Sequence, residues 1–128
     1  MKSEQPRLRR LWWFLGLVLL VAIAVLSLIP LRGPVIDVPS SDKLLHAFAY
    51  VVLTLYFGEL VGDGRLTRVL IGLLMYGIAI ELLQTLAPPR SAELADLVAN
   101  LAGMLIGTLL LRTPLGRGLR LFERLVRR

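Results

Sequence analysis

Four long stretches of mostly apolar residues, separated by charged residues, glycine or proline, constrain the fold of this chain more than any other feature. They cover residues 11–29, 44–61, 66–87 and 94–111. A helix needs about 20 mostly apolar residues to cross the roughly 30 Å hydrocarbon core of a bilayer. Hydrophobic residues make up 56% of the 128-residue chain, an excess that a soluble domain of this size cannot bury. We therefore predict an all-α integral membrane four-helix bundle that forms a single domain over residues 1–128.

The residues between the apolar stretches are typical of turns. Gly-Asp-Gly at 62–64 predicts a tight turn after the second stretch. Pro-Pro at 88–89 ends the third stretch, because proline lacks the N–H that would continue a helix. Ser91 is predicted to N-cap the fourth helix. The first stretch is longer than the roughly 7–15 apolar residues of a signal peptide, so we expect it to be a retained membrane span.

The distribution of basic residues predicts the orientation. Lys and Arg in short loops favour the cytoplasmic side of a membrane. Of the 15 Lys and Arg residues, only Arg32, Lys43 and Arg90 fall on one side of the predicted bundle, and the other twelve fall on the side of the two termini. We therefore expect both termini to be cytoplasmic and the loops at 30–42 and 88–93 to face outward.

The end of the chain is a basic tail. From about residue 112 to 128, leucine, phenylalanine and valine alternate with arginine so that a helix would have one apolar and one basic face. We expect such a helix to lie on an anionic membrane surface. The alternative is that its basic face binds an acidic partner protein. In a chain this apolar, the net charge of +6 indicates contact of basic residues with anionic lipid head groups. We therefore predict no nucleic-acid partner. The absence of cysteine excludes thiol chemistry and disulfides.

Polar side chains fall in the outer half of the second, third and fourth stretches. Such groups are costly inside a bilayer and usually face a cavity or a partner. Glu81 lies six residues before Ala87, roughly 9 Å along a helix axis, which is too deep for a simple head-group contact. Residues three or four apart share one helix face, so we expect three polar faces to converge. The pairs are His46 with Tyr50, Glu81 with Gln84, and Asp96 with Asn100.

These motifs resemble the VanZ-like membrane protein family over about residues 42–111. The residues that carry the resemblance are Asp-Lys-Leu-Leu-His at 42–46 with Tyr50, Glu-Leu-Leu-Gln at 81–84, Arg90, and Asp-Leu at 96–97 with Asn100 and Gly103. The resemblance implies a multi-pass protein of the bacterial inner (cytoplasmic) membrane. It also implies a link to low-level resistance to the glycopeptide teicoplanin.

The predicted site combines acid/base groups with anion-binding groups. Glu81 and Asp96 are the candidate acid/base or cation-holding pair, with His46 as the proton carrier. A metal ion or other cofactor is not predicted, because the chain has one histidine and no His-Glu-x-x-His spacing. The remaining candidate ligand-binding residues are Arg90 and Lys43, which would hold an anionic group, together with Asp42, Tyr50, Gln84 and Asn100.

Three classes of function fit this pattern. The first is a protein that binds or modifies an envelope component, such as a lipid-linked head group, a peptidoglycan precursor or a glycopeptide, and catalytic turnover is left open. The second is a structural or assembly membrane protein whose polar residues only lock the helices together. The third is a small transporter subunit. Gly103 and Gly107 predict close helix packing within the bundle, with homodimerisation as the alternative, so the oligomeric state is not fixed.

Overall fold

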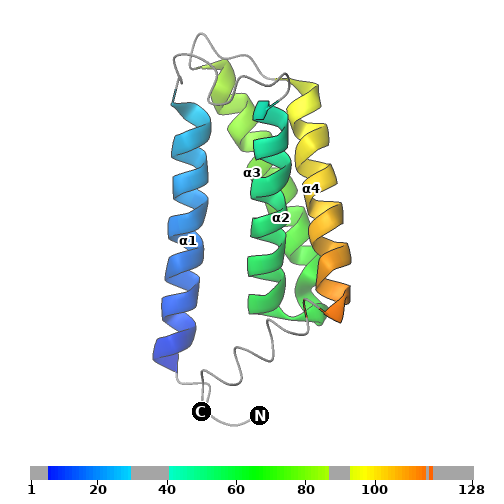
Figure 1. Ribbon diagram of the computed structural model, residues 1–128. Coiled ribbons are helices and arrows are strands. Elements are labelled where there is room, and N and C mark those ends of the chain that lie inside the picture. Colours follow the sequence, from blue (N-terminus) through cyan, green and yellow to red (C-terminus); the bar gives the residue numbers. More distant parts are fainter. Residues whose placement is uncertain (1–5, 30–40, 87–92, 115, 117–128) are drawn as a thin grey trace.

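The fold was analysed in a computed structural model that describes residues 6–29, 41–86, 93–114 and 116 (Figure 1). The described residues form an all-α four-helix bundle without strands, as predicted, and each of the four long helices is long and apolar enough to cross a membrane. The predicted basic surface helix falls largely on residues 115 and 117–128, which lie outside the described part. The elements are α1 (Pro6–Leu28), α2 (Ser41–Val61), the 3-10 turn η1 (Asp63–Arg65), α3 (Leu66–Thr85) and α4 (Leu94–Arg112).

The helix ends follow the predicted punctuation with one correction. Gly62 has a φ of 77°, a left-handed conformation that glycine adopts readily, and leads into η1, which confirms the tight turn. The N-cap of α4 is Glu93, so the prediction that Ser91 caps this helix is wrong. Glu93 makes no side-chain cap. Its extended backbone instead lets its carbonyl accept the Asp96 N–H at 3.0 Å.

The closest helix packing in the bundle is between α2 and α4. A Cβ atom added to Gly103 would collide with the carbonyl oxygen of Ala47, and one added to Gly107 would lie 2.7 Å from the Thr54 Cβ. These glycines therefore let the two helix backbones approach each other, as small residues do in membrane bundles. The prediction of packing within the bundle is confirmed. This glycine face is covered by α2 and is not open to a second copy of the chain.

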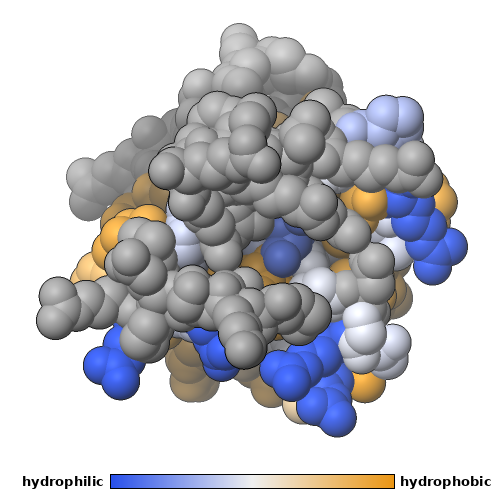
Figure 2. Space-filling model, turned by 90° about the horizontal axis from the view of Figure 1, so that it is seen from below, coloured by the Kyte–Doolittle hydropathy of each residue, from blue (hydrophilic) through white to orange (hydrophobic). Residues whose placement is uncertain are grey.

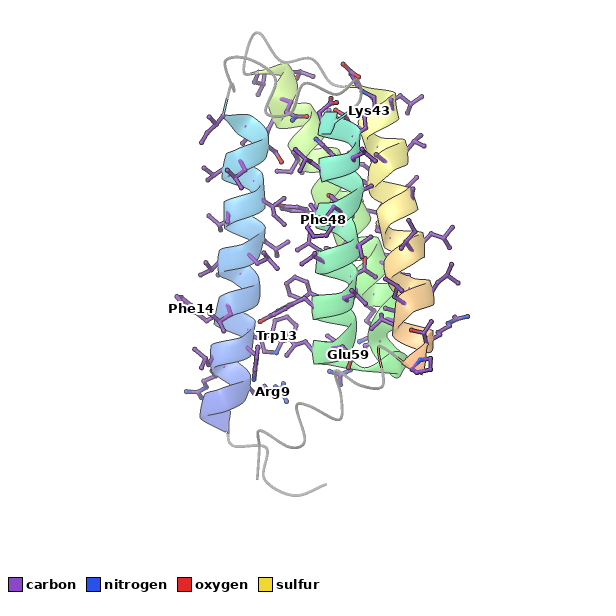
Figure 3. All side chains as sticks on the ribbon, viewed as in Figure 1. Arg9, Trp13, Phe14, Lys43, Phe48 and Glu59 are labelled. Carbon is purple, nitrogen blue, oxygen red and sulfur yellow. The ribbon has the colours of Figure 1, made fainter. Side chains whose placement is uncertain are left out.

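Helix α1 stands beside the other three (Figure 1), and aromatic side chains contribute to its contacts with α2 and α3. The Tyr56 hydroxyl donates to the Trp12 carbonyl at 2.7 Å, and the Tyr76 hydroxyl donates to the Leu20 carbonyl at 2.6 Å. Near the start of α1, Trp13 points toward α2 (Figure 3), where its ring centroid lies 6.1 Å from that of Phe57. These contacts fix the position of α1 along the bundle.

Removal of the Tyr76 hydroxyl is expected to loosen α1 slightly. Because hydrogen bonds between membrane helices contribute about 0.6 kcal/mol on average, Tyr76→Phe should lower the free energy of unfolding by about that amount. Denaturant titration of the purified protein in mixed micelles would measure it. A matched control is Phe48→Leu, since Phe48 is an exposed α2 residue that forms no part of the aromatic core.

The two ends of the bundle differ in charge. Hydrophilic residues gather around the end at which α1 begins and α4 ends, seen from below in Figure 2. Exposed arginines there include Arg9, Arg65 and Arg112. The candidate site residues of α2, α3 and α4 lie at the opposite end of the bundle, where α2 and α4 begin and α3 ends. We call that end the polar end. That the termini face the cytoplasm stays a prediction from the basic residues.

Candidate functional site

Three side chains from three different helices meet at the polar end. His46 of α2, Glu81 of α3 and Asp96 of α4 each present one nitrogen or oxygen atom, and these atoms lie within 4.8 Å of one another. Glu81 is only 8% exposed and Asp96 only 6%, while His46 is half-buried. The sequence prediction that polar faces of α2, α3 and α4 converge therefore describes the geometry of the structure. We call these three residues the triad.

The helix directions place the triad at one level of the bundle. His46 lies in the second turn of α2 and Asp96 in the first turn of α4, while Glu81 lies about one turn before the end of α3. Because α3 runs opposite to α2 and α4, all three positions fall near the same end. The N-terminal turn of a helix favours a negative charge, which stabilises the Asp96 carboxylate there.

Lys43 lies near the beginning of α2 (Figure 3) and is paired with acidic residues, one of which belongs to the triad. Its Nζ lies 3.0 Å from Glu93 Oε2, 3.6 Å from Asp42 Oδ2 and 3.7 Å from Asp96 Oδ1. An anion that binds to Lys43 would have to compete with these carboxylates. Sequence reasoning missed Glu93, although it is an acidic residue directly before a predicted helix, a place where a carboxylate is stabilised by the helix dipole.

Asn100 and Tyr50 lie below the triad. His46 Nδ1 and Asn100 Oδ1 are 3.3 Å apart, so the imidazole can donate to the amide oxygen and is thereby oriented. Tyr50, a predicted ligand-binding residue, is 3% exposed and packs inside the bundle. Gly77 of α3 makes room for both polar groups: a Cβ there would lie 2.7 Å from the Tyr50 hydroxyl oxygen and 3.1 Å from Asn100 Nδ2.

Two further hydrogen bonds tie the site to its surroundings. The backbone N–H of Glu93 donates to Glu81 Oε2 at 3.2 Å, which links α3 to the beginning of α4. Gln84 Nε2 donates to the Ser27 carbonyl at 2.9 Å. Helix α1, which the sequence predicts as a membrane span without any candidate site residue, thus contributes a backbone carbonyl beside the site. The contact is made by a main-chain oxygen, which every residue has, so the sequence of α1 carries no signal for it.

Several buried acceptor atoms at the polar end lack a hydrogen-bond partner among the described residues. They are Glu81 Oε1, Asp96 Oδ1 and Gln84 Oε1, and Gln84 is only 2% exposed. An unsatisfied buried acceptor costs about 1–3 kcal/mol, and more if it is charged, so native proteins rarely retain one without a partner. This arrangement can therefore accept hydrogen bonds from a ligand or coordinate a cation. Arg90, the predicted anion-binding residue of the outer loop, lies outside the described residues.

Comparison with known protein families matches residues 5–116, most of the chain, to the family described as VanZ/LLP1. The chain belongs to the VanZ/LLP1 family. The match confirms the resemblance seen in the motifs and extends it to α1, which the motif-bearing region at 42–111 does not include. The whole α1–α4 bundle is thus the family unit.

One curated relative of this VanZ/LLP1 protein is the uncharacterized protein C11E3.10 of Schizosaccharomyces pombe. It is 32% identical over 98 residues, which cover 73% of this chain and 58% of the yeast protein. The matched region therefore spans little more than half of that relative. No solved structure matches the chain.

Proposed function

We propose that this VanZ/LLP1 protein binds the head group of a cell-envelope component at the polar end of its bundle. The favoured ligand class is a phosphate-bearing, lipid-linked head group that also carries hydroxyl or amide N–H donors, as a peptidoglycan precursor does. In this proposal the polar end faces outward from a bacterial inner membrane. Binding of such a component would link the protein to teicoplanin susceptibility.

The buried acceptors that lack a hydrogen-bond partner among the described residues carry this proposal. Glu81 Oε1 and Asp96 Oδ1 belong to the triad, and Gln84 Oε1 is on the next turn of α3. The hydroxyl or amide groups of a head group would donate hydrogen bonds to these acceptors. Lys43, whose Nζ lies 3.7 Å from Asp96 Oδ1, would hold the phosphate, and Arg90, which lies between α3 and α4 in the sequence, would be the second cation for it. Asp42 would hold Lys43 in place, since their charged atoms are 3.6 Å apart.

The same residues provide a proton route if the bound group is modified. With Nδ1 of His46 donating to Asn100 Oδ1, the other ring nitrogen keeps a lone pair and can accept a proton. Glu81 and Asp96 are the acid/base partners, since each has a carboxylate oxygen within 4.8 Å of a His46 ring nitrogen. Tyr50 and Asn100, both buried below the triad, hold this geometry.

A scaffold role is the second candidate, and three observations favour it. Lys43 is paired with three carboxylates, Glu81 is bonded to the backbone of Glu93, and Gln84 is bonded to the backbone of α1. A protein whose polar residues only lock the bundle would bind no head group. Binding and stability measurements on the same variants therefore separate the two roles.

Thermal unfolding of the purified protein in detergent should show stabilisation by a pyrophosphate-linked lipid precursor and none by phosphatidylcholine. A ligand at 100 times its dissociation constant stabilises the folded state by about 2.7 kcal/mol. In Arg90→Ala the unliganded melting temperature should stay near the wild-type value, because a loop residue contributes little to the bundle, while the stabilisation by the precursor should fall. Equal stabilisation of both proteins would show that Arg90 does not capture the anion.

A further inference from the structure

We propose that the triad, His46, Glu81 and Asp96, binds one divalent transition-metal ion, with Zn²⁺ as the best match. The sequence contains one histidine and no His-Glu-x-x-His motif, so it predicts no metal site. The three ligands come instead from three helices that only the fold brings together. The proposal deepens the proposed function, whose chemistry a bound ion would serve, but metal binding itself can be measured without any head group.

The ligand atoms have the identity and spacing that such an ion requires. Imidazole nitrogen and carboxylate oxygen are both common zinc ligands, with bonds of about 2.0–2.2 Å that place neighbouring ligand atoms roughly 3.4 Å apart. In the structure the three atoms lie within 4.8 Å of one another. Side-chain rotations that move each of the three ligand atoms by about 1 Å would bring them to bonding distance of one ion. Three protein ligands leave a fourth position for water or a substrate oxygen, as in catalytic zinc sites.

The charge balance of the site also calls for a cation. Glu81 and Asp96 are both more than nine-tenths buried, and each has an oxygen without a hydrogen-bond partner among the described residues. The nearest described cation, Lys43, lies 3.7 Å from Asp96 and is held more closely by Glu93 at 3.0 Å. One lysine shared among Asp42, Glu93 and Asp96 cannot balance all of these carboxylates. A divalent ion beside Glu81 and Asp96 would.

Asn100 supplies the supporting contact that histidine ligands usually have. A histidine bound to a metal generally donates its other ring N–H to an oxygen, which fixes the tautomer and the direction of the ring. His46 Nδ1 lies 3.3 Å from Asn100 Oδ1, and Asn100 is itself buried between α2, α3 and α4. This contact leaves Nε2 with the lone pair that a metal ion needs. Asn100 therefore acts as a positioning residue and not as a ligand.

Metal titration of the full chain tests the proposal. Purified protein in detergent, first treated with a chelator, is titrated in separate experiments with ZnCl₂, MnCl₂ and MgCl₂ and followed by calorimetry. We expect saturable binding of one Zn²⁺ per chain, weaker binding of Mn²⁺ and little of Mg²⁺, whose preference for oxygen ligands suits this set poorly. Absence of saturable binding of any of the three ions to the wild-type protein would overturn the proposal, whether or not the protein binds a head group.

Substitutions locate the ion. His46→Gln, Glu81→Gln and Asp96→Asn should each weaken Zn²⁺ binding by more than about 100-fold, and Asn100→Ala by about 10–100-fold, the range for supporting residues. The matched control is Glu59→Gln, because Glu59 lies on the same helix as His46 but at the opposite end of the bundle (Figure 3). Circular dichroism of each variant identifies any that fail to fold. Should folded triad variants bind Zn²⁺ as tightly as Glu59→Gln does, the ion is bound elsewhere and the assignment is wrong.

A spectroscopic readout keeps the test independent of variant stability. Co²⁺ substituted into the wild-type protein should give visible absorption bands of a four-coordinate site with nitrogen and oxygen ligands, and excess Zn²⁺ should remove them. A spectrum identical to that of hydrated Co²⁺ would contradict coordination by the triad. The comparison uses no activity and no head group, so its outcome is distinct from that of the proposed function.

Discussion

Glu81→Gln is expected to weaken head-group binding strongly and thereby to abolish any teicoplanin resistance conferred by the protein, while the amount of protein in the membrane stays near the wild-type level. Glutamine has the size of glutamate and keeps one oxygen, which can still accept the Glu93 N–H. It replaces the other, unpartnered oxygen with an NH₂ group and removes the charge. The contact to α4 is therefore preserved, and only the acceptor available to a ligand is lost.

The expected loss follows from the strength of one charged hydrogen bond. Hydrogen bonds to charged groups contribute about 1.5–3 kcal/mol, so binding should weaken by roughly 10- to 200-fold. The loss can be measured as the precursor concentration needed to stabilise the purified protein and, in cells, as the inhibitory concentration of teicoplanin. Glu59→Gln is the control, since it removes the same charge near the end of α2, at the opposite end of the bundle from Glu81.

Two outcomes would speak against the binding role of Glu81. If the Glu81→Gln protein disappears from the membrane, the residue holds the bundle together and the scaffold role is favoured. If the protein is present and binds the precursor as tightly as Glu59→Gln does, the unpartnered oxygen has no ligand. Measurement of protein level and binding on the same preparation distinguishes the two.

The sequence predicts the bundle well because the bilayer imposes a simple rule. A membrane span must be a helix of about 20 apolar residues, and this length was visible in all four stretches. Helix ends were less predictable. Ser91 has the side chain of a good cap, yet α4 begins after Glu93 and without a side-chain cap, because Glu93 has other partners in the Glu81 carboxylate and Lys43.

The convergence of the site was predictable for a related reason. Polar residues three or four apart within an apolar helix must share a face, and in antiparallel spans they fall at one depth. Partners that come from the backbone or from loops leave no such pattern. The Ser27 carbonyl beside Gln84 and the Glu93 N–H beside Glu81 are of this kind. The metal proposal depends on distances across three helices, which no spacing along the chain encodes.

Gly103→Ala is expected to cause the largest loss of stability of any single methyl group added to a glycine of the bundle interior. The new Cβ would collide with the carbonyl oxygen of Ala47 and lie 2.9 Å from the Tyr50 Cβ. A backbone oxygen within α2 cannot rotate away as a side chain can, so α2 and α4 must separate. Overpacking of a core typically costs about 1–3 kcal/mol, and the collision with backbone places Gly103 at the upper end.

Gly72→Ala provides the matched control, because Gly72 lies on the exposed side of α3 and a Cβ there would meet no atom within 4 Å. Denaturant titration in mixed micelles should show a lower free energy of unfolding for Gly103→Ala and an unchanged or slightly higher one for Gly72→Ala.

Gly103 lies one turn from Asn100 on α4, and Ala47 directly follows His46 on α2. Separation of these helices must therefore lengthen the His46–Asn100 contact, so Gly103→Ala should also weaken ligand binding at the polar end. Equal stability of the two variants would show that α2 and α4 do not cross this closely in the membrane, and the geometry of the triad would then have to be revised with it.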